Sequence, residues 1–302
     1  LANSGLFATH EIRTGVRKRK DWEPACRLAQ DLLPLRSDIL IRSLGFTTQK
    51  AGAYAQLLLT GGANARAVAI LLDERESFDR KSDRFAVSPV AHAISIAQKQ
   101  GLPWVILSRG SQLRLYPARP DKGVGRKSLA ETFFELDLAL LSHDNAGYLP
   151  LVFSADALQE NGTTEEILHS SAQYAVALGS RLRDKVYNEI IPPLSVRVAK
   201  ELAEQGQVMD KEGLDLAYRL TLRIFFRLLF QAYAEDRKLL PFGENERYTR
   251  NALKTVALDL VREPEQVFDP DSCSLWDDLA QVWRVIDKGD KAWDVPPYNG
   301  GL

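Results

Sequence analysis

The sequence has little cysteine and no long uncharged apolar run. Its two cysteines, Cys26 and Cys273, are far apart and lack CxxC spacing, which excludes a disulfide scaffold and a zinc ribbon. The most apolar stretch, 214–234, contains three arginines, and these would be too costly inside a bilayer. No apolar run follows the basic residues near the start, as a secretory signal would require. We therefore expect no membrane partner and a cytoplasmic location.

Methionine is also scarce, and the charge is uneven. Met209 is the single methionine of the 302 residues, and position 1 is Leu, so we expect a piece of a longer protein. Residues 1–145 carry 21 Lys and Arg against 15 Asp and Glu, whereas the remainder carries 18 against 25. This asymmetry, in a chain of globular composition, predicts two domains with different partners.

The first half of the chain alternates strand and helix signals. Asp21 can cap a helix that continues to residue 33, a short helix is expected at 39–44, and Ser88 with Pro89 begins a helix that ends near residue 100. Strands are predicted at 54–60, 67–72, 104–107 and 113–116. Residues 134–138 alternate as a strand does, although Ser128 and Glu131 could also form a helix capping box. This order predicts a small sheet with helices packed on it.

After about residue 149 the pattern indicates helices only. A long helix that begins with a Thr163–Glu166 capping box is expected to end at Pro192-Pro193, and further helices are predicted at 214–238, 251–261 and around 276–283. The predicted fold class is α+β, with an α/β domain over 1–147 and an all-helical domain over 148–302.

Four motifs occur in an order that is informative: Asn3-Ser4-Gly5-Leu6-Phe7, Trp104-Val105-Ile106-Leu107 with Leu113-Arg114-Leu115-Tyr116, Phe225-Phe226-Arg227-Leu228-Leu229-Phe230 with Tyr233-Ala234-Glu235-Asp236-Arg237 and Leu239-Leu240-Pro241, and Pro297-Tyr298-Asn299-Gly300-Gly301-Leu302. Together they resemble the N-terminal region of type IIG restriction–modification proteins and of the related adenine-specific DNA methyltransferases of BREX and DISARM phage-defence systems. The resemblance touches both ends and the middle of the chain.

The resemblance implies a restriction-endonuclease-like α/β domain of the PD-(D/E)xK type, followed by an all-helical connector. It places the methyltransferase domain, with its S-adenosylmethionine (SAM), beyond Leu302. The sequence agrees, because it contains no Asn-Pro-Pro-Tyr motif and no glycine-rich loop between a buried strand and a helix. We therefore expect no cofactor and no methyltransferase activity in this fragment, and double-stranded DNA or other defence-system subunits as partners.

The expected nuclease position falls at Asp73-Glu74-Arg75, directly after the 67–72 strand. Nuclease chemistry of this type uses two carboxylates from successive strands to bind Mg²⁺, and a lysine beside the attacking water. Asp73 could still bind a metal, but Arg75 stands in the lysine position and stays protonated. No Asp or Glu occurs between Asp38 and Asp73, so the preceding strand offers no second carboxylate. Asp79 and Lys81 are spaced suggestively, but the surrounding polar stretch favours a solvated loop. The nuclease is predicted to be degenerate, with Mg²⁺ relevant only if it is active.

Two groups of basic residues are candidates for DNA binding. The cluster Arg17-Lys18-Arg19-Lys20 can neutralise phosphates, and a solvated N-terminal arm is an equally good interpretation. Arg219, Arg223 and Arg227 are four residues apart and share one helix face. They could follow a phosphate backbone, but pairing with Glu201, Glu204 or Asp236 is the favoured interpretation in so apolar a helix.

Three hypotheses for function follow. The leading one is the N-terminal part of a DNA restriction–modification or phage-defence methyltransferase that binds or positions DNA. The alternatives are an active Mg²⁺-dependent DNA endonuclease and a protein-interaction scaffold of a defence complex.

Overall fold

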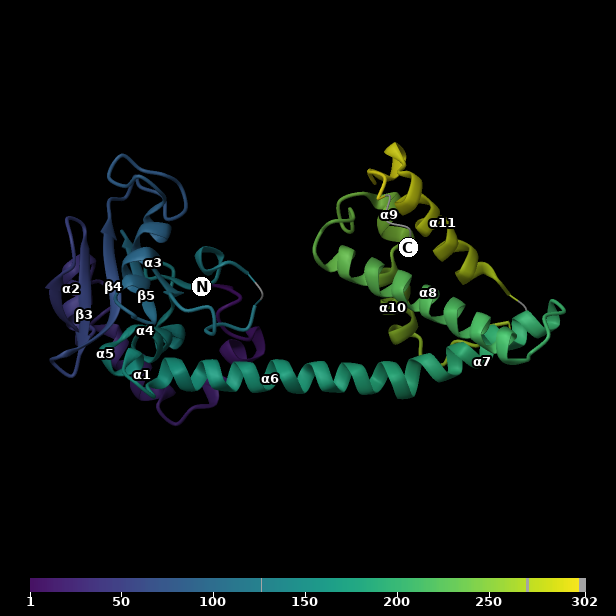
Figure 1. Ribbon diagram of the computed structural model, residues 1–302, viewed down its shortest axis with the longest axis horizontal. Coiled ribbons are helices and arrows are strands. Elements are labelled where there is room, and N and C mark those ends of the chain that lie inside the picture. The colour runs from purple at the N-terminus through teal and green to yellow at the C-terminus, as the bar shows by residue number, and fades with distance from the viewer. Residues whose placement is uncertain (126, 270–271, 299–302) are drawn as a thin grey trace. The chain divides into compact units, whose positions relative to one another are not determined.

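The computed structural model describes residues 1–125, 127–269 and 272–298, and its mixed α/β architecture is shown in Figure 1. The chain divides into two compact units, Leu1–Arg181 and Leu182–Leu302. The first unit contains the sheet, and the regular elements described in the second are all helical. The expected combination of an α/β part followed by a helical part is confirmed at this level.

The sheet of the first unit has seven strands within the described residues, in the order β1-β7-β6-β5-β4-β3-β2. Every neighbouring pair is antiparallel except β4 and β5, which are parallel. A parallel pair requires a crossover connection, and helix α3 (Pro89–Lys99), capped by Ser88 as expected, lies in that connection. The strands are β1 (Ala2–Ser4), β2 (Thr47–Lys50), β3 (Ala55–Thr60), β4 (Asn64–Leu72), β5 (Trp104–Arg109), β6 (Gln112–Pro117) and β7 (Phe133–Asp137).

Alternating side chains of these strands build a core on each face of the sheet. On one face, strand residues such as Ala69 and Ile106 pack with α1 (Trp22–Gln30), α2 (Ser37–Ser43) and α4 (Tyr148–Phe153). On the other face, Ile70 and Leu107 pack under α3. The remaining short elements are η1 (Glu11–Gly15), η2 (Val16–Lys18), η3 (Leu129–Glu131) and η4 (His143–Asn145). Ser128 and Glu131 form the capping box of η3, and β7 follows it, so both expectations for this region hold.

The first unit extends further along the chain than the expected division at 147/148. Helix α4, α5 (Ala155–Leu158) and the start of α6 (Thr163–Lys185) all contribute to its core, for example through Leu149 and Ile167. The predicted boundary therefore falls inside this unit. The prediction of a Thr163–Glu166 capping box is also wrong. The Thr163 hydroxyl donates to Leu151 O instead, and the Glu166 carboxylate pairs with Arg19.

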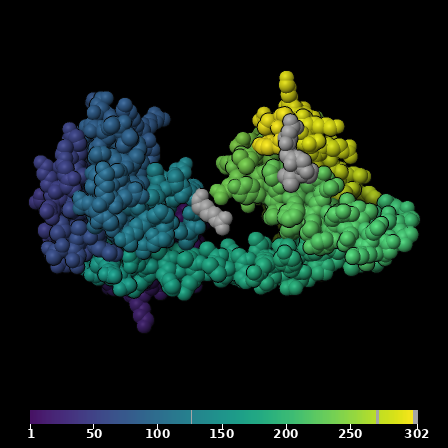
Figure 2. Space-filling model, viewed as in Figure 1, coloured from purple at the N-terminus to yellow at the C-terminus, as the bar shows by residue number. Residues whose placement is uncertain are grey.

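The second unit is built from helices, and Figure 2 shows α11 in yellow lying on the green residues of α8. The prolines at 192 and 193 do not end a helix here. They lie in the first turn of α7, where proline is tolerated because the first amides have no intrahelical partner. The elements are η5 (Val186–Ile190), α7 (Ile191–Glu204), α8 (Lys211–Asp236), α9 (Glu246–Asn251), α10 (Leu253–Arg262), α11 (Ser274–Lys288) and η6 (Lys291–Trp293).

A buried carboxylate organises the core of this unit. The Glu235 side chain on α8, only 2% exposed, accepts hydrogen bonds from Gln231 Nε2 at 2.9 Å and Tyr248 OH at 3.0 Å. It also accepts from the backbone amides of Leu253 and Lys254, each at 2.9 Å. These amides begin α10, whose own N-cap residue supplies no side-chain hydrogen bond. The glutamate of the Tyr233–Arg237 motif thus caps a neighbouring helix.

The motif at the start of the chain is also a local structure. The Asn3 side chain accepts from Phe7 N at 3.2 Å and donates to Phe7 O at 2.8 Å, and Gly5 between them has a φ of 74° that favours glycine. Of the C-terminal motif, Tyr298 is described and its hydroxyl donates to Leu239 O at 2.6 Å. Its last four residues lie outside the described residues.

None of the helices described here has both the length and the apolar character that a membrane crossing requires.

Candidate functional site

The predicted nuclease position lies at the carboxyl end of β4, beside the end of the parallel strand β5. Asp73 follows directly after β4, but its side chain is 83% exposed and lies 3.6 Å from Arg84 Nη1. Glu74 and Arg75 are exposed as well. Arg84 has a closer partner in Glu76 Oε2, at 2.6 Å, and the same oxygen accepts from Asp73 N at 3.0 Å. This carboxylate is therefore already engaged by an arginine.

The residues at this edge do not fit a Mg²⁺ site. Strand β3, which neighbours β4, reads AQLLLT and carries no acid. Across the described residues, no group of three or more His, Cys, Asp or Glu side chains could hold a metal. A hollow of about 430 Å³ lies beside β3, and its lining includes Lys50, Gln56 and Arg84 but no described carboxylate. Such a lining suits an anion better than a cation.

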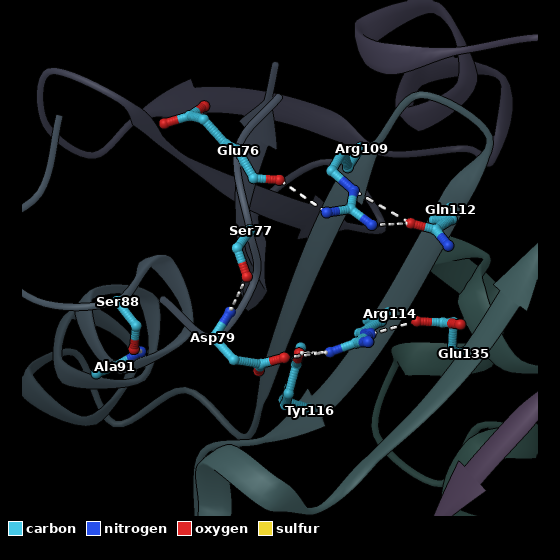
Figure 3. A network of polar contacts seen from close by, with 10 residues as sticks. All are labelled: Glu76, Ser77, Asp79, Ser88, Ala91, Arg109, Gln112, Arg114, Tyr116 and Glu135. Atoms are coloured by element: carbon cyan, nitrogen blue, oxygen red, sulfur yellow. Dashed lines mark hydrogen bonds and ion pairs between the residues drawn. The ribbon is translucent and has the colours of Figure 1, made fainter. Parts of the chain in front are cut away.

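Two arginines attach the segment after β4 to the sheet: in Figure 3, Arg109 donates to Glu76 O and Arg114 pairs with Asp79. Two guanidinium groups also lie over the buried Phe78 ring, that of Arg109 at 4.7 Å and that of Arg114 at 4.3 Å from its centroid. Arg114 also lies 4.3 Å from the Phe133 ring. These distances are within the range of cation–π attraction. The segment from residue 73 to 88 is therefore held in place by packing and charge.

Arg114 is also the centre of the polar contacts in Figure 3. It pairs with Glu135 on β7, with Asp79 Oδ2 at 3.1 Å, and it donates to Tyr116 OH at 3.0 Å. Burial raises the pKa of the Tyr116 phenol above its usual value, although the Arg114 hydrogen bond partly offsets this. For Arg114, burial lowers the pKa, but the bonds to Tyr116 and Glu135 outweigh it and the net pKa is raised. Asp79 lies in a loop, as predicted, and its role is structural.

The basic cluster near the start is part of the folded unit and not a free arm. Arg17 Nε donates to Tyr148 OH at 3.3 Å, Arg17 Nη2 donates to Asn145 Oδ1, and the guanidinium lies 5.9 Å from the Trp22 ring centroid. All three partners are neutral. The positive charge of Arg17 is therefore fixed in position without being cancelled.

Arg19 differs from its neighbours, because two acids compensate it. It lies 2.8 Å from Asp21 and 3.0 Å from Glu166 of α6. The hydrogen bond from Arg19 lowers the pKa of Asp21. Lys18 and Lys20 are exposed, and no ion pair of either is found within the described part of the chain. The cluster thus divides into a structural arginine, Arg19, and three uncompensated cations.

Two of the three acids expected to pair with the α8 arginines pair with other basic residues. Glu201 pairs with Arg197 at 2.5 Å, and Asp236 pairs with Lys254, so neither serves the stripe. Arg219 and Arg223 are exposed and have no ion pair within the described residues. The Arg227 guanidinium lies 5.5 Å from the Trp283 ring centroid. The apolar character of this helix favours ion pairing, but it does not show which acids lie near the stripe in the fold. Contact of this stripe with DNA stays a prediction.

Some residues around the basic cluster carried no sequence signal. Tyr148 and Asn145, which hold Arg17, are more than 120 residues away from it in the chain. Arg13, one turn before Arg17, is exposed and has no ion pair within the described residues.

We find no match of the chain to a protein-family model, to a curated protein or to a solved structure. Function is therefore inferred from the motifs and from this geometry.

Proposed function

We propose that the chain is the N-terminal part of a DNA restriction–modification or phage-defence methyltransferase, and that its first unit binds and positions double-stranded DNA without cutting it. The three hairpin-linked strands β2, β3 and β4, the α3 crossover and the parallel strand β5 support a nuclease-like ancestry for the sheet. The helical second unit supports the role of a connector. In the parent protein, SAM would belong to the methyltransferase domain.

The observation that carries the proposal is the uncompensated charge of Arg17, Lys18 and Lys20. Phosphate binding requires cations whose charge is not neutralised within the protein. Arg17 is oriented by neutral partners only, whereas Arg19, two residues later, is compensated by acids. Rigid placement lowers the entropy lost when a phosphate is bound.

An active nuclease is the weaker alternative, because the exposed Asp73 has no second acid on β3 and Glu76 is bound by Arg84. A protein-interaction scaffold would need no uncompensated cations.

The test is fluorescence anisotropy of a labelled duplex titrated with the full chain at low salt. The double variant Lys18→Ala/Lys20→Ala removes two exposed charges from the cluster, and its matched control, Lys99→Ala/Lys288→Ala, removes two exposed charges from α3 and α11. We expect at least about tenfold weaker binding for the first and little change for the control. Equal losses for the two doubles would contradict the proposed surface, and no binding of the wild type at low salt would favour the scaffold.

A further inference from the structure

A hollow of about 410 Å³ lies beside the basic cluster. It is an open hollow lined by segments that are distant in the sequence: η1 and η2, the stretch that follows β7, η4 and the start of α4. Its volume is within the range of small-molecule sites in proteins. Neither the sequence motifs nor the proposed binding of duplex DNA explains it.

The charge of this hollow has one sign. Its lining includes Arg13 and Arg17, and none of the described residues that line it is acidic. Arg17 uses Nε and Nη2 for Tyr148 and Asn145, and no hydrogen bond of its Nη1 is found within the described residues. Two guanidinium groups beside one hollow form a strong electrostatic site for an anion with several oxygen atoms.

The neutral polar groups of the lining keep Arg17 in place and add a donor. The Tyr148 hydroxyl donates to Ile12 O at 2.6 Å and accepts from Arg17 Nε, so it connects η1 to the guanidinium. Asn145 Nδ2 donates to Ser142 Oγ at 2.7 Å. The Ser142 hydroxyl proton therefore remains available for a bound anion. Arg17, Ser142 and Asn145 are thus linked before any ligand arrives.

The apolar part of the lining consists of Leu1, Ile12, Leu140 and Leu141, and the Leu140 side chain is largely exposed. A bare inorganic ion would leave this surface and most of the volume unused. A ligand with a terminal phosphate and an organic part would use both. A terminal phosphate also offers three unesterified oxygens and up to two charges, whereas a phosphate within a strand offers two such oxygens and one charge.

We propose that this hollow binds a phosphate monoester, supplied either by the 5′ end of a nucleic-acid strand or by a free nucleotide. Arg13 and Arg17 bind the phosphate oxygens, the Ser142 hydroxyl donates a further hydrogen bond, and Tyr148 acts as a positioning residue through Arg17. If the phosphate belongs to the 5′ end of a strand, this proposal rests on the proposed DNA binding and extends it. If the phosphate belongs to a free nucleotide, the two proposals are independent.

The experiment compares ligands that differ only in the phosphate, using the full chain. Single-stranded oligonucleotides of one sequence with a 5′-phosphate or a 5′-hydroxyl are titrated by anisotropy through a 3′ label, and AMP and adenosine are titrated by calorimetry. We expect at least about tenfold tighter binding of the phosphorylated member of at least one pair. A preference confined to the oligonucleotides identifies a strand end, and AMP binding identifies a nucleotide.

Variants then show which residues are responsible for the tighter binding of phosphorylated ligands. Arg13→Ala and Arg17→Ala should each reduce the phosphate preference to about unity, whereas Arg27→Ala, which removes an exposed charge from α1 outside the lining, should preserve it. Arg13 makes no ion pair within the described residues, so its variant tests the site even if Arg17→Ala weakens folding. Lys18→Ala/Lys20→Ala should weaken both oligonucleotides equally, which separates this site from general DNA binding. Equal affinities within both ligand pairs, or a preference that survives Arg13→Ala in folded protein, would overturn the assignment.

Discussion

Replacement of Glu235 tests whether its buried hydrogen bonds stabilise the helical unit. Glu235→Ala removes one carboxylate that accepts four hydrogen bonds at 2.9–3.0 Å inside the core. Two amides at the start of α10, the Tyr248 hydroxyl and the Gln231 amide would lose their acceptor where water has little access. Each unsatisfied group costs about 1–3 kcal/mol and the losses are not additive, so we expect a total near 3–5 kcal/mol, as for other broken buried charge networks.

Two further variants separate this effect from general loss of charge. Glu235→Gln keeps the shape and one acceptor oxygen but brings an NH₂ group towards donors, so we expect an intermediate loss of about 1–3 kcal/mol. Asp236→Ala, at the neighbouring position, breaks only a surface ion pair with Lys254 and should cost less than about 1 kcal/mol.

The assay is hydrogen exchange of the full chain, read at peptides that cover α10. Faster exchange of the first amides of α10 in Glu235→Ala, combined with a lowered thermal midpoint, is the expected result. If Glu235→Ala resembles Asp236→Ala in both measurements, the capping role is refuted.

Three further predictions concern the first unit and pH. Incubation with Mg²⁺ or Mn²⁺ should produce no nicking of plasmid DNA, and nicking that Asp73→Ala abolishes would show an active nuclease. Arg114→Ala should lower stability by about 3 kcal/mol, because it leaves Glu135 half-buried without its arginine; an unchanged thermal midpoint would refute this. The raised pKa values of Tyr116 and Tyr248 mean that the unfolded chain releases these protons near pH 10 while the folded chain retains them. Stability should therefore be fully present below pH 10 and fall above it by up to about 1.4 kcal/mol per pH unit for each tyrosine, and Tyr248→Phe should reduce that slope in denaturant titrations.

Much of the fold could be predicted where local signals are strong. Strand β4 has a continuous apolar run, and α3 begins with Ser88 and Pro89 and ends before a glycine. The sequence does not predict β1 and β2, because these strands are short and largely exposed and thus lack an alternating pattern. The sequence does not predict α7, because two adjacent prolines favour the end of a helix, although the same residues suit a first turn.

The candidate site was predictable only in part, because its chemistry depends on distant partners. Charge alone identifies the cluster of four cations, but the distinction between Arg17 and Arg19 depends on Tyr148 and Glu166. The absence of acids on β3 was visible in the sequence. The ion pair between Glu76 and Arg84 was not visible in the sequence, because the path of the loop brings the two side chains together.

The most direct test of DNA binding by the cluster is the salt dependence of duplex affinity. If Lys18 and Lys20 each neutralise one phosphate, the slope of log K against log salt should be about 1.8 less steep in Lys18→Ala/Lys20→Ala than in the wild type. The double variant on α3 and α11 should keep the wild-type slope. An unchanged slope for Lys18→Ala/Lys20→Ala in folded protein would contradict the proposed function of this surface.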